Sequence, residues 1–170
     1  MSKLFADIFF LAGLNVRENM LSGTLSSAIE NLASLKSLHL ESNRFQGPIP
    51  SSIGSLAYLG EQCGAFLSSC LILVYFVSKQ TNYNIFALYA EELALSDNSF
   101  NNSLPTEIFK ILSLKFLYLE NNKLSGTLPS EVGNLVSLER LILDGNSFRG
   151  TTPAEIGDMI NLGAFYIEDT

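Results

Sequence analysis

A period of 24 residues runs through nearly the whole chain and constrains its fold more than any other feature. Leucines open equivalent units at Leu11, Leu35, Leu114, Leu138 and Leu162. A further copy lacks the opening leucine and matches from Leu93 onward. Because one such unit is too short to bury its own apolar face, the period predicts a solenoid in which each unit packs only against its neighbours.

Two apolar residues, spaced two apart, follow the opening position of each unit, as Leu117 and Leu119 do. This alternation predicts a short strand with one buried face. Three residues after the pair stands an asparagine, whose amide both donates and accepts hydrogen bonds. We expect these asparagines to satisfy backbone groups where the chain turns and to stack into a ladder. The ladder asparagines are Asn19, Asn43, Asn98, Asn122 and Asn146.

The second half of each unit carries residues typical of turns. The fourth position after the asparagine is glycine in every unit except one, where it is Asn102. Both residue types tolerate positive φ, a backbone conformation that is sterically unfavourable for most other residues. A proline follows in four of the five units. Since proline fixes φ and lacks a donor, it suits the start of the segment that returns along the convex side.

The best-formed copy, LKFLYLENNKLSGTLPSEVGNL at Leu114–Leu135, resembles the plant-type leucine-rich repeat found in receptor-like proteins and receptor kinases. The resemblance recurs along about four-fifths of the chain. It implies an α/β-type repeat solenoid, a horseshoe or superhelix with a parallel β-sheet on its concave face. It also implies a second set of short strands around the LSGxLP segment, and a binding surface rather than a catalytic one.

The repeat is interrupted once, which predicts three regions: leucine-rich repeats in residues 1–59, a non-repeat hydrophobic insertion in residues 60–90, and further repeats in residues 91–170. Removing residues 60–90 brings Leu59 to the opening position and restores the period, because the 55 residues from Leu59 to Leu114 less 31 leave 24. Codons for Gly60-Glu61 and Ala90-Glu91 can contain splice donor and acceptor sites. We therefore interpret the segment as translated intron.

Three other interpretations of the insertion stay open: a genuine loop insertion, a hydrophobic helix that docks on a partner, and a membrane anchor. The uncharged run Gly64–Val77 has 14 residues, fewer than the roughly 20 that a membrane-spanning helix needs. The only cysteines, Cys63 and Cys70, lie in this segment, and the cysteine pairs that cap repeats of the resembling family are absent. No disulfide framework is expected.

Both ends of the chain fall inside a unit. Asp7 interrupts the first apolar run, so no signal peptide is expected, and Thr170 stands where a ladder asparagine is due. We expect a fragment of a longer repeat protein, or a gene model without its flanks. The sequence carries no address for a compartment, whereas the resemblance implies an extracellular or membrane-associated protein.

Outward residues beside the buried strand pairs are expected to line the concave face. Eight of the 17 acidic residues fall there, namely Glu18, Glu41, Glu92, Asp97, Glu120, Asp144, Glu168 and Asp169. Aromatic and aliphatic residues join them toward the C-terminal end. The predicted partner-binding residues are Glu41, Glu92, Asp97, Phe116, Tyr118, Glu120, Arg140, Ile142, Asp144, Tyr166 and Glu168.

Aromatic anchors beside charges are typical of binding hot spots, and an acidic field attracts basic partners. The surface therefore predicts a protein or peptide ligand with basic and apolar groups. The alternative is that exposed strand positions are simply polar and that the acidic bias keeps a solenoid soluble. With 17 acidic against 10 basic residues, nucleic acid is a poor candidate partner.

Catalysis is not expected. His39 is the only histidine, and the chain contains no GxxxxGK[ST], no GxGxxG and no cluster of metal ligands. No cofactor or metal is expected either. The preferred function is a non-catalytic recognition module. The alternatives are a membrane-associated receptor-like fragment anchored by residues 64–77 and a non-functional fragment.

Overall fold

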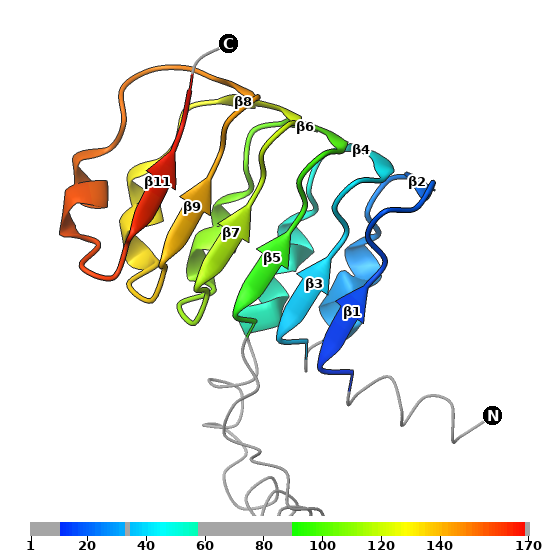
Figure 1. Ribbon diagram of the computed structural model, residues 1–170. Helices are drawn as coiled ribbons and strands as arrows, with labels where there is room; N and C mark the ends of the chain where they lie inside the picture. The colour runs from blue at the N-terminus through cyan, green and yellow to red at the C-terminus, as the bar shows by residue number, and fades with distance from the viewer. Residues whose placement is uncertain (1–10, 33–34, 58–89, 169–170) are drawn as a thin grey trace, which may run out of the picture.

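The repeats coil into a solenoid with two parallel sheets and a row of short helices (Figure 1). The computed structural model describes residues 11–32, 35–57 and 90–168. The larger sheet has six strands: β1 (Gly13–Asn15), β3 (Ser37–His39), β5 (Glu92–Ala94), β7 (Phe116–Tyr118), β9 (Arg140–Ile142) and β11 (Ala164–Tyr166). The smaller sheet has five: β2 (Ser22–Gly23), β4 (Arg44–Gly47), β6 (Ser99–Asn102), β8 (Lys123–Gly126) and β10 (Ser147–Phe148).

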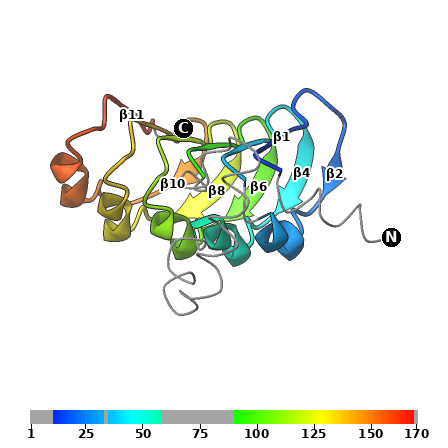
Figure 2. The ribbon, with the colours of Figure 1, turned by 90° about the horizontal axis from the view of Figure 1, so that it is seen from below.

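The returning segments are single 3-10 helices, which lie side by side in one row (Figure 2). They are η1 (Ser27–Asn31), η2 (Ser51–Ala57), η3 (Thr106–Lys110), η4 (Ser130–Asn134) and η5 (Ala154–Asp158). Prolines stand immediately before η3, η4 and η5, as predicted. Proline suits this position because its φ is fixed and because its missing N–H is not needed for a hydrogen bond within the helix. The face of the six-stranded sheet that points away from the core is called the concave face.

The core runs continuously along the solenoid between the sheets and the helices. The central residues of the four inner strands of the larger sheet, such as Leu38, Leu93 and Leu117, are fully buried, whereas Leu14 and Phe165 of the two end strands are partly buried. Phenylalanines at the apolar position after the ladder asparagine stack on each other, with the rings of Phe45 and Phe100 6.1 Å apart and nearly parallel. The predicted solenoid and its second set of strands are thus confirmed.

The asparagines bind one unit to the next. The Asn122 amide donates to its own unit at the Leu119 carbonyl and to the preceding unit at the Leu95 carbonyl, at 3.1 and 3.0 Å. Its Oδ1 accepts a hydrogen bond from the Phe100 N–H of the preceding unit at 3.0 Å. Asn43, Asn98 and Asn146 repeat this pattern.

The units on either side of the interruption are consecutive units of one solenoid. Strand β3 pairs with β5 in register, Leu38 opposite Leu93, as β5 pairs with β7. Ala90 occupies the opening position that leucine holds elsewhere, and it is buried. Residues 58–89 lie outside the described residues, so the predicted boundaries at residues 60 and 90 and the intron interpretation remain predictions.

One conformational requirement was missed by the sequence analysis. The residue before each ladder asparagine has positive φ, between 52° and 63°, in all five units. These residues are Glu18, Ser42, Asp97, Asn121 and Gly145. The predicted positive φ four residues after the asparagine is confirmed, at 66° for Asn102 and 79–97° for the glycines.

Candidate functional site: the concave face

All the predicted partner-binding residues lie on the concave face or on the turns that leave it. Glu92, Phe116, Tyr118, Arg140, Ile142 and Tyr166 are on strands β5 to β11. Glu41, Asp97, Glu120, Asp144 and Glu168 come two or three residues after the end of a strand. Because side chains alternate along a strand, the buried leucines between them hold these residues outward. The structure divides them into three groups.

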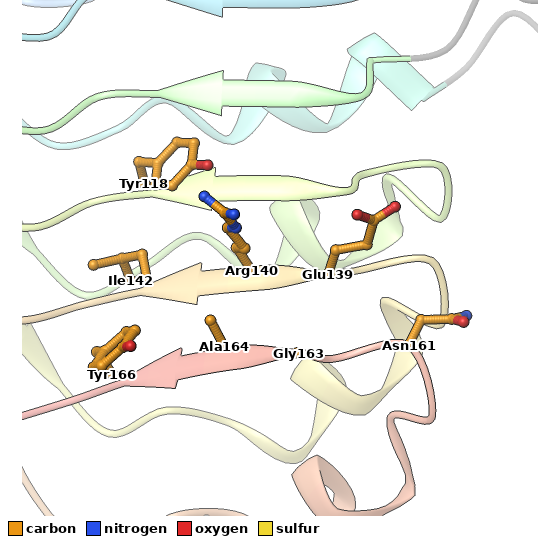
Figure 3. Close-up of a pocket in the computed structure, with 8 residues that line it drawn as sticks. All are labelled: Tyr118, Glu139, Arg140, Ile142, Asn161, Gly163, Ala164 and Tyr166. Atoms are coloured by element: carbon orange, nitrogen blue, oxygen red, sulfur yellow. The ribbon is translucent and has the colours of Figure 1, made fainter.

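The first group surrounds an open hollow of about 660 Å³ at the C-terminal end of the sheet (Figure 3). Tyr118, Ile142 and Tyr166 come from three neighbouring strands, and the Arg140 side chain extends from β9 toward Tyr118. The Tyr166 side chain is 54% exposed. We call this site the aromatic hollow; its lining residues are Tyr118, Glu139, Arg140, Ile142, Asn161, Gly163, Ala164 and Tyr166.

The hollow exists because strand β11 begins with small residues. Ala164 pairs with Arg140, and Arg140 pairs with Phe116, so β11 carries a methyl group where its neighbours carry large side chains. Gly163 precedes it with no side chain at all. Phe116 lies outside the hollow and stacks on Tyr118, with ring centroids 6.3 Å apart. The stack supports the Tyr118 ring from one side.

Glu139, Asn161 and Gly163 were not predicted as site residues. They stand before the strands, in the turns that lead from the helices. Asn161 donates to the Val136 carbonyl at 2.8 Å, which fixes the turn between η5 and β11. The sequence contains one signal for the hollow. The small pair Gly163-Ala164 stands at the repeat positions where the two preceding units have the larger pairs Lys115-Phe116 and Glu139-Arg140.

The second group is at the N-terminal end of the concave face and centres on His39. Its Nδ1 lies 3.3 Å from Glu41 Oε1, and its Nε2 lies 3.7 Å from Glu92 Oε2. Arg17 also approaches Glu41, at 4.0 Å. These partly exposed pairs add little to stability, about 0–1 kcal/mol each. The Arg17 guanidinium offsets some of the acidic charge at this end.

The third group follows the strands as a row of carboxylates engaged with the turns. Asp97 Oδ1 accepts a hydrogen bond from the Asn121 amide at 2.8 Å, and Asp144 Oδ1 accepts one from the Glu168 N–H at 3.0 Å. These two carboxylates are therefore part of the structure of the turns. Nearby on the leading turns, Lys115 donates to Glu91 at 2.9 Å, and this hydrogen bond raises the pKa of Lys115 above its ordinary value.

A family model described as Leucine Rich Repeat matches the chain at residues 34–56, 113–135 and 137–159. These matches coincide with stacked units that contain the strands, the helices and the buried leucines described above. The chain is a plant-type leucine-rich repeat protein.

Solved structures similar to this leucine-rich repeat chain include ectodomains of plant receptors. The plant peptide hormone receptor RGFR1 in complex with RGF2 is 30% identical, with a TM-score of 0.67, and the match covers 88% of this chain and 19% of that one. The receptor kinase GASSHO1/SCHENGEN3 from Arabidopsis thaliana, in complex with CASPARIAN STRIP INTEGRITY FACTOR 2, is 29% identical, with a TM-score of 0.73 and coverages of 96% and 16%.

The ectodomain of the receptor kinase SOBIR1 from Arabidopsis thaliana is 29% identical, with a TM-score of 0.66 and coverages of 88% and 64%. The leucine-rich repeat chain thus spans about a fifth or less of the first two receptor structures and under two thirds of the third. No curated protein sequence matches it.

Within the described part of the leucine-rich repeat chain, no group of three or more His, Cys, Asp or Glu residues is arranged to hold a metal ion. No helix in the same residues is long and apolar enough to cross a membrane. The proposed anchor in residues 64–77 and both cysteines lie outside the described residues.

Proposed function

We propose that this chain is a non-catalytic recognition module that binds an extended peptide, or a peptide segment of a protein, on its concave face. The observation that carries the proposal is the aromatic hollow, whose lining also includes the Glu139 carboxylate and the Arg140 guanidinium. Two tyrosines and an isoleucine from adjacent strands provide apolar contact area in one place. The similar receptor ectodomains RGFR1 and GASSHO1/SCHENGEN3, solved with RGF2 and CASPARIAN STRIP INTEGRITY FACTOR 2, support a peptide or protein ligand.

Rigid aromatic side chains suit this role because they bury a large area at a small cost in conformational entropy. Tyr118 and Tyr166 are held by strands of a hydrogen-bonded sheet, so their positions are set before a ligand arrives. The acidic residues around them favour a ligand with basic as well as apolar groups. By the same likeness, we propose that the module acts on the extracellular side or in association with a membrane.

The proposal is tested by replacing Tyr118 and Tyr166 together with alanine. A library of short random linear peptides is selected on the original chain, and the affinity of the enriched peptides is then measured for both proteins. Hot-spot aromatics contribute about 2 kcal/mol or more each, so binding should weaken at least about 100-fold. The free energy of unfolding should change little, because both rings lie on the surface of the sheet.

A matched variant carries Met20→Ala and Leu112→Ala, which remove two exposed apolar side chains outside the six-stranded sheet. It should bind the enriched peptides as the original chain does. Equal affinity of the tyrosine variant and the original chain, or failure of the library to yield any concave-face ligand, would reject the proposal.

A further inference from the structure

Strand β5 and the turn after it contribute the smallest outward side chains in the middle of the concave face. Ala94 lies between His39 of β3 and Tyr118 of β7 in the sheet register. Two residues later, Ser96 lies between Glu41 and Glu120: the Ser96 carbonyl accepts from Ser42 N–H, and the Glu120 carbonyl from Asp97 N–H. Ala94 and Ser96 are each only 5% exposed, so they form the floor of a notch between larger neighbours.

Two buried carboxylate oxygens at this notch have unused hydrogen-bonding capacity. Glu41 Oε2 and Glu120 Oε2 are withdrawn from solvent and accept no hydrogen bond. The other Glu41 oxygen, Oε1, is the one that approaches His39 and Arg17. Ser96, buried between them, adds a hydroxyl that can accept or donate a hydrogen bond. Buried polar groups are normally paired in native proteins, so the two unpaired carboxylate oxygens indicate an external donor.

The spacing of the Glu41 and Glu120 carboxylates indicates which cationic group suits the notch. Neighbouring strands are about 4.8 Å apart, which places the Glu41 and Glu120 backbones about 10 Å apart on either side of Ser96. One flat cationic group with donors on opposite edges can bridge the two carboxylates across Ser96. A guanidinium has five N–H donors in a plane, whereas an ammonium is a compact point charge.

We propose that the notch formed by Glu41, Ser96 and Glu120 is a subsite for an arginine side chain of the bound peptide. The inference rests on the proposed function and adds the second anchor of the ligand. The notch on β5 and the aromatic hollow between β9 and β11 are separated by two to three strand spacings, about 12 Å. An extended peptide advances about 3.3 Å per residue, so the arginine and the apolar anchor should be about four positions apart.

The test uses the same library of short random linear peptides, selected separately on the original chain and on the Glu41→Gln, Glu120→Gln variant. Glutamine keeps the size of the side chain and removes its charge. Arginine should be enriched about four positions from an aromatic or aliphatic residue on the original chain only. Replacing that arginine with citrulline, which is neutral and of similar shape, should weaken binding to the original chain about tenfold or more and to the variant hardly at all.

The matched control is Glu131→Gln with Glu155→Gln, which removes the same charge from exposed positions on η4 and η5. It should keep the preference for arginine over citrulline. If arginine is not enriched, or if its preference survives in the Glu41→Gln, Glu120→Gln variant, the subsite is rejected, while binding that depends on Tyr118 and Tyr166 still supports the proposed function. If no enriched peptide depends on those tyrosines, both proposals fail.

Discussion

At the scale of single residues, the position of an asparagine in the ladder decides how much it stabilises the fold. The Asn122 side chain is buried and bonds to two units, so it satisfies backbone groups that water does not reach. Asn19 is exposed and, among the described residues, donates only to carbonyls of its own unit, those of Val16 and Arg17. The same residue type in the same column therefore has two different energetic roles.

Replacing Asn122 with aspartate should lower the free energy of unfolding by at least about 2 kcal/mol, because a carboxylate cannot donate to the carbonyls of Leu95 and Leu119. Asn19→Asp makes the same change in charge and shape, and should cost less than about 1 kcal/mol. Urea unfolding followed by circular dichroism measures both. If both variants lose the same free energy of unfolding, the hydrogen bonds between units are not the source of the ladder's contribution to stability.

At the scale of elements, helix η2 stacks on η3 closely enough to require glycine at residue 54. A β-carbon on Gly54 of η2 would lie 2.7 Å from both the β-carbon and the carbonyl oxygen of Glu107 in η3. Backbone atoms cannot move aside cheaply, so this contact sets how near η2 and η3 can come. A β-carbon on Gly157 of η5 would meet no atom within 4 Å.

Gly54→Ala should therefore destabilise the chain by about 1–3 kcal/mol through overpacking. Gly157→Ala, made in the equivalent position of another unit, should be neutral or stabilise by up to about 1 kcal/mol, because alanine restricts the unfolded chain more than glycine does. Denaturant unfolding of both variants checks this. A Gly54→Ala variant as stable as the Gly157→Ala variant would contradict the close approach of η2 and η3.

At the scale of the whole molecule, strand β3 pairs with β5 across the interruption, so we expect that residues 60–90 are not required to join the two sets of repeats. Without them, Leu59 would take the opening position that Ala90 occupies. Each buried methylene contributes about 0.8 kcal/mol, and leucine has three more carbons than alanine. A chain lacking residues 60–90 should thus fold into the same solenoid and be about 1–3 kcal/mol more stable.

The control lacks residues 60–90 and carries Leu59→Ala, so it isolates the contribution of the Leu59 side chain in the opening position. Circular dichroism and denaturant unfolding compare the two shortened chains with the original. Aggregation or lower stability of the chain without residues 60–90 would mean that the segment supports the fold. Sequencing the transcript across the codons for Leu59 and Glu91 tests the intron interpretation separately.

The sequence by itself determined the solenoid, the strand positions and the columns of leucine, asparagine and glycine. It could do so because a fixed period makes each residue the neighbour of its equivalent in the next unit, and a pattern repeated in successive units leaves one way to stack them. The concave position of Tyr118 and Tyr166 followed from strand alternation alone. The partner they bind remains a prediction.

Only the tertiary structure decided which outward residues lie together. The positive φ before each asparagine falls on residues as different as Glu18, Ser42 and Gly145, so no residue type marked it. The aromatic hollow and the notch over Ser96 depend on differences in side-chain volume between adjacent strands. A repeat pattern records what units have in common, whereas a binding site is built from what distinguishes them.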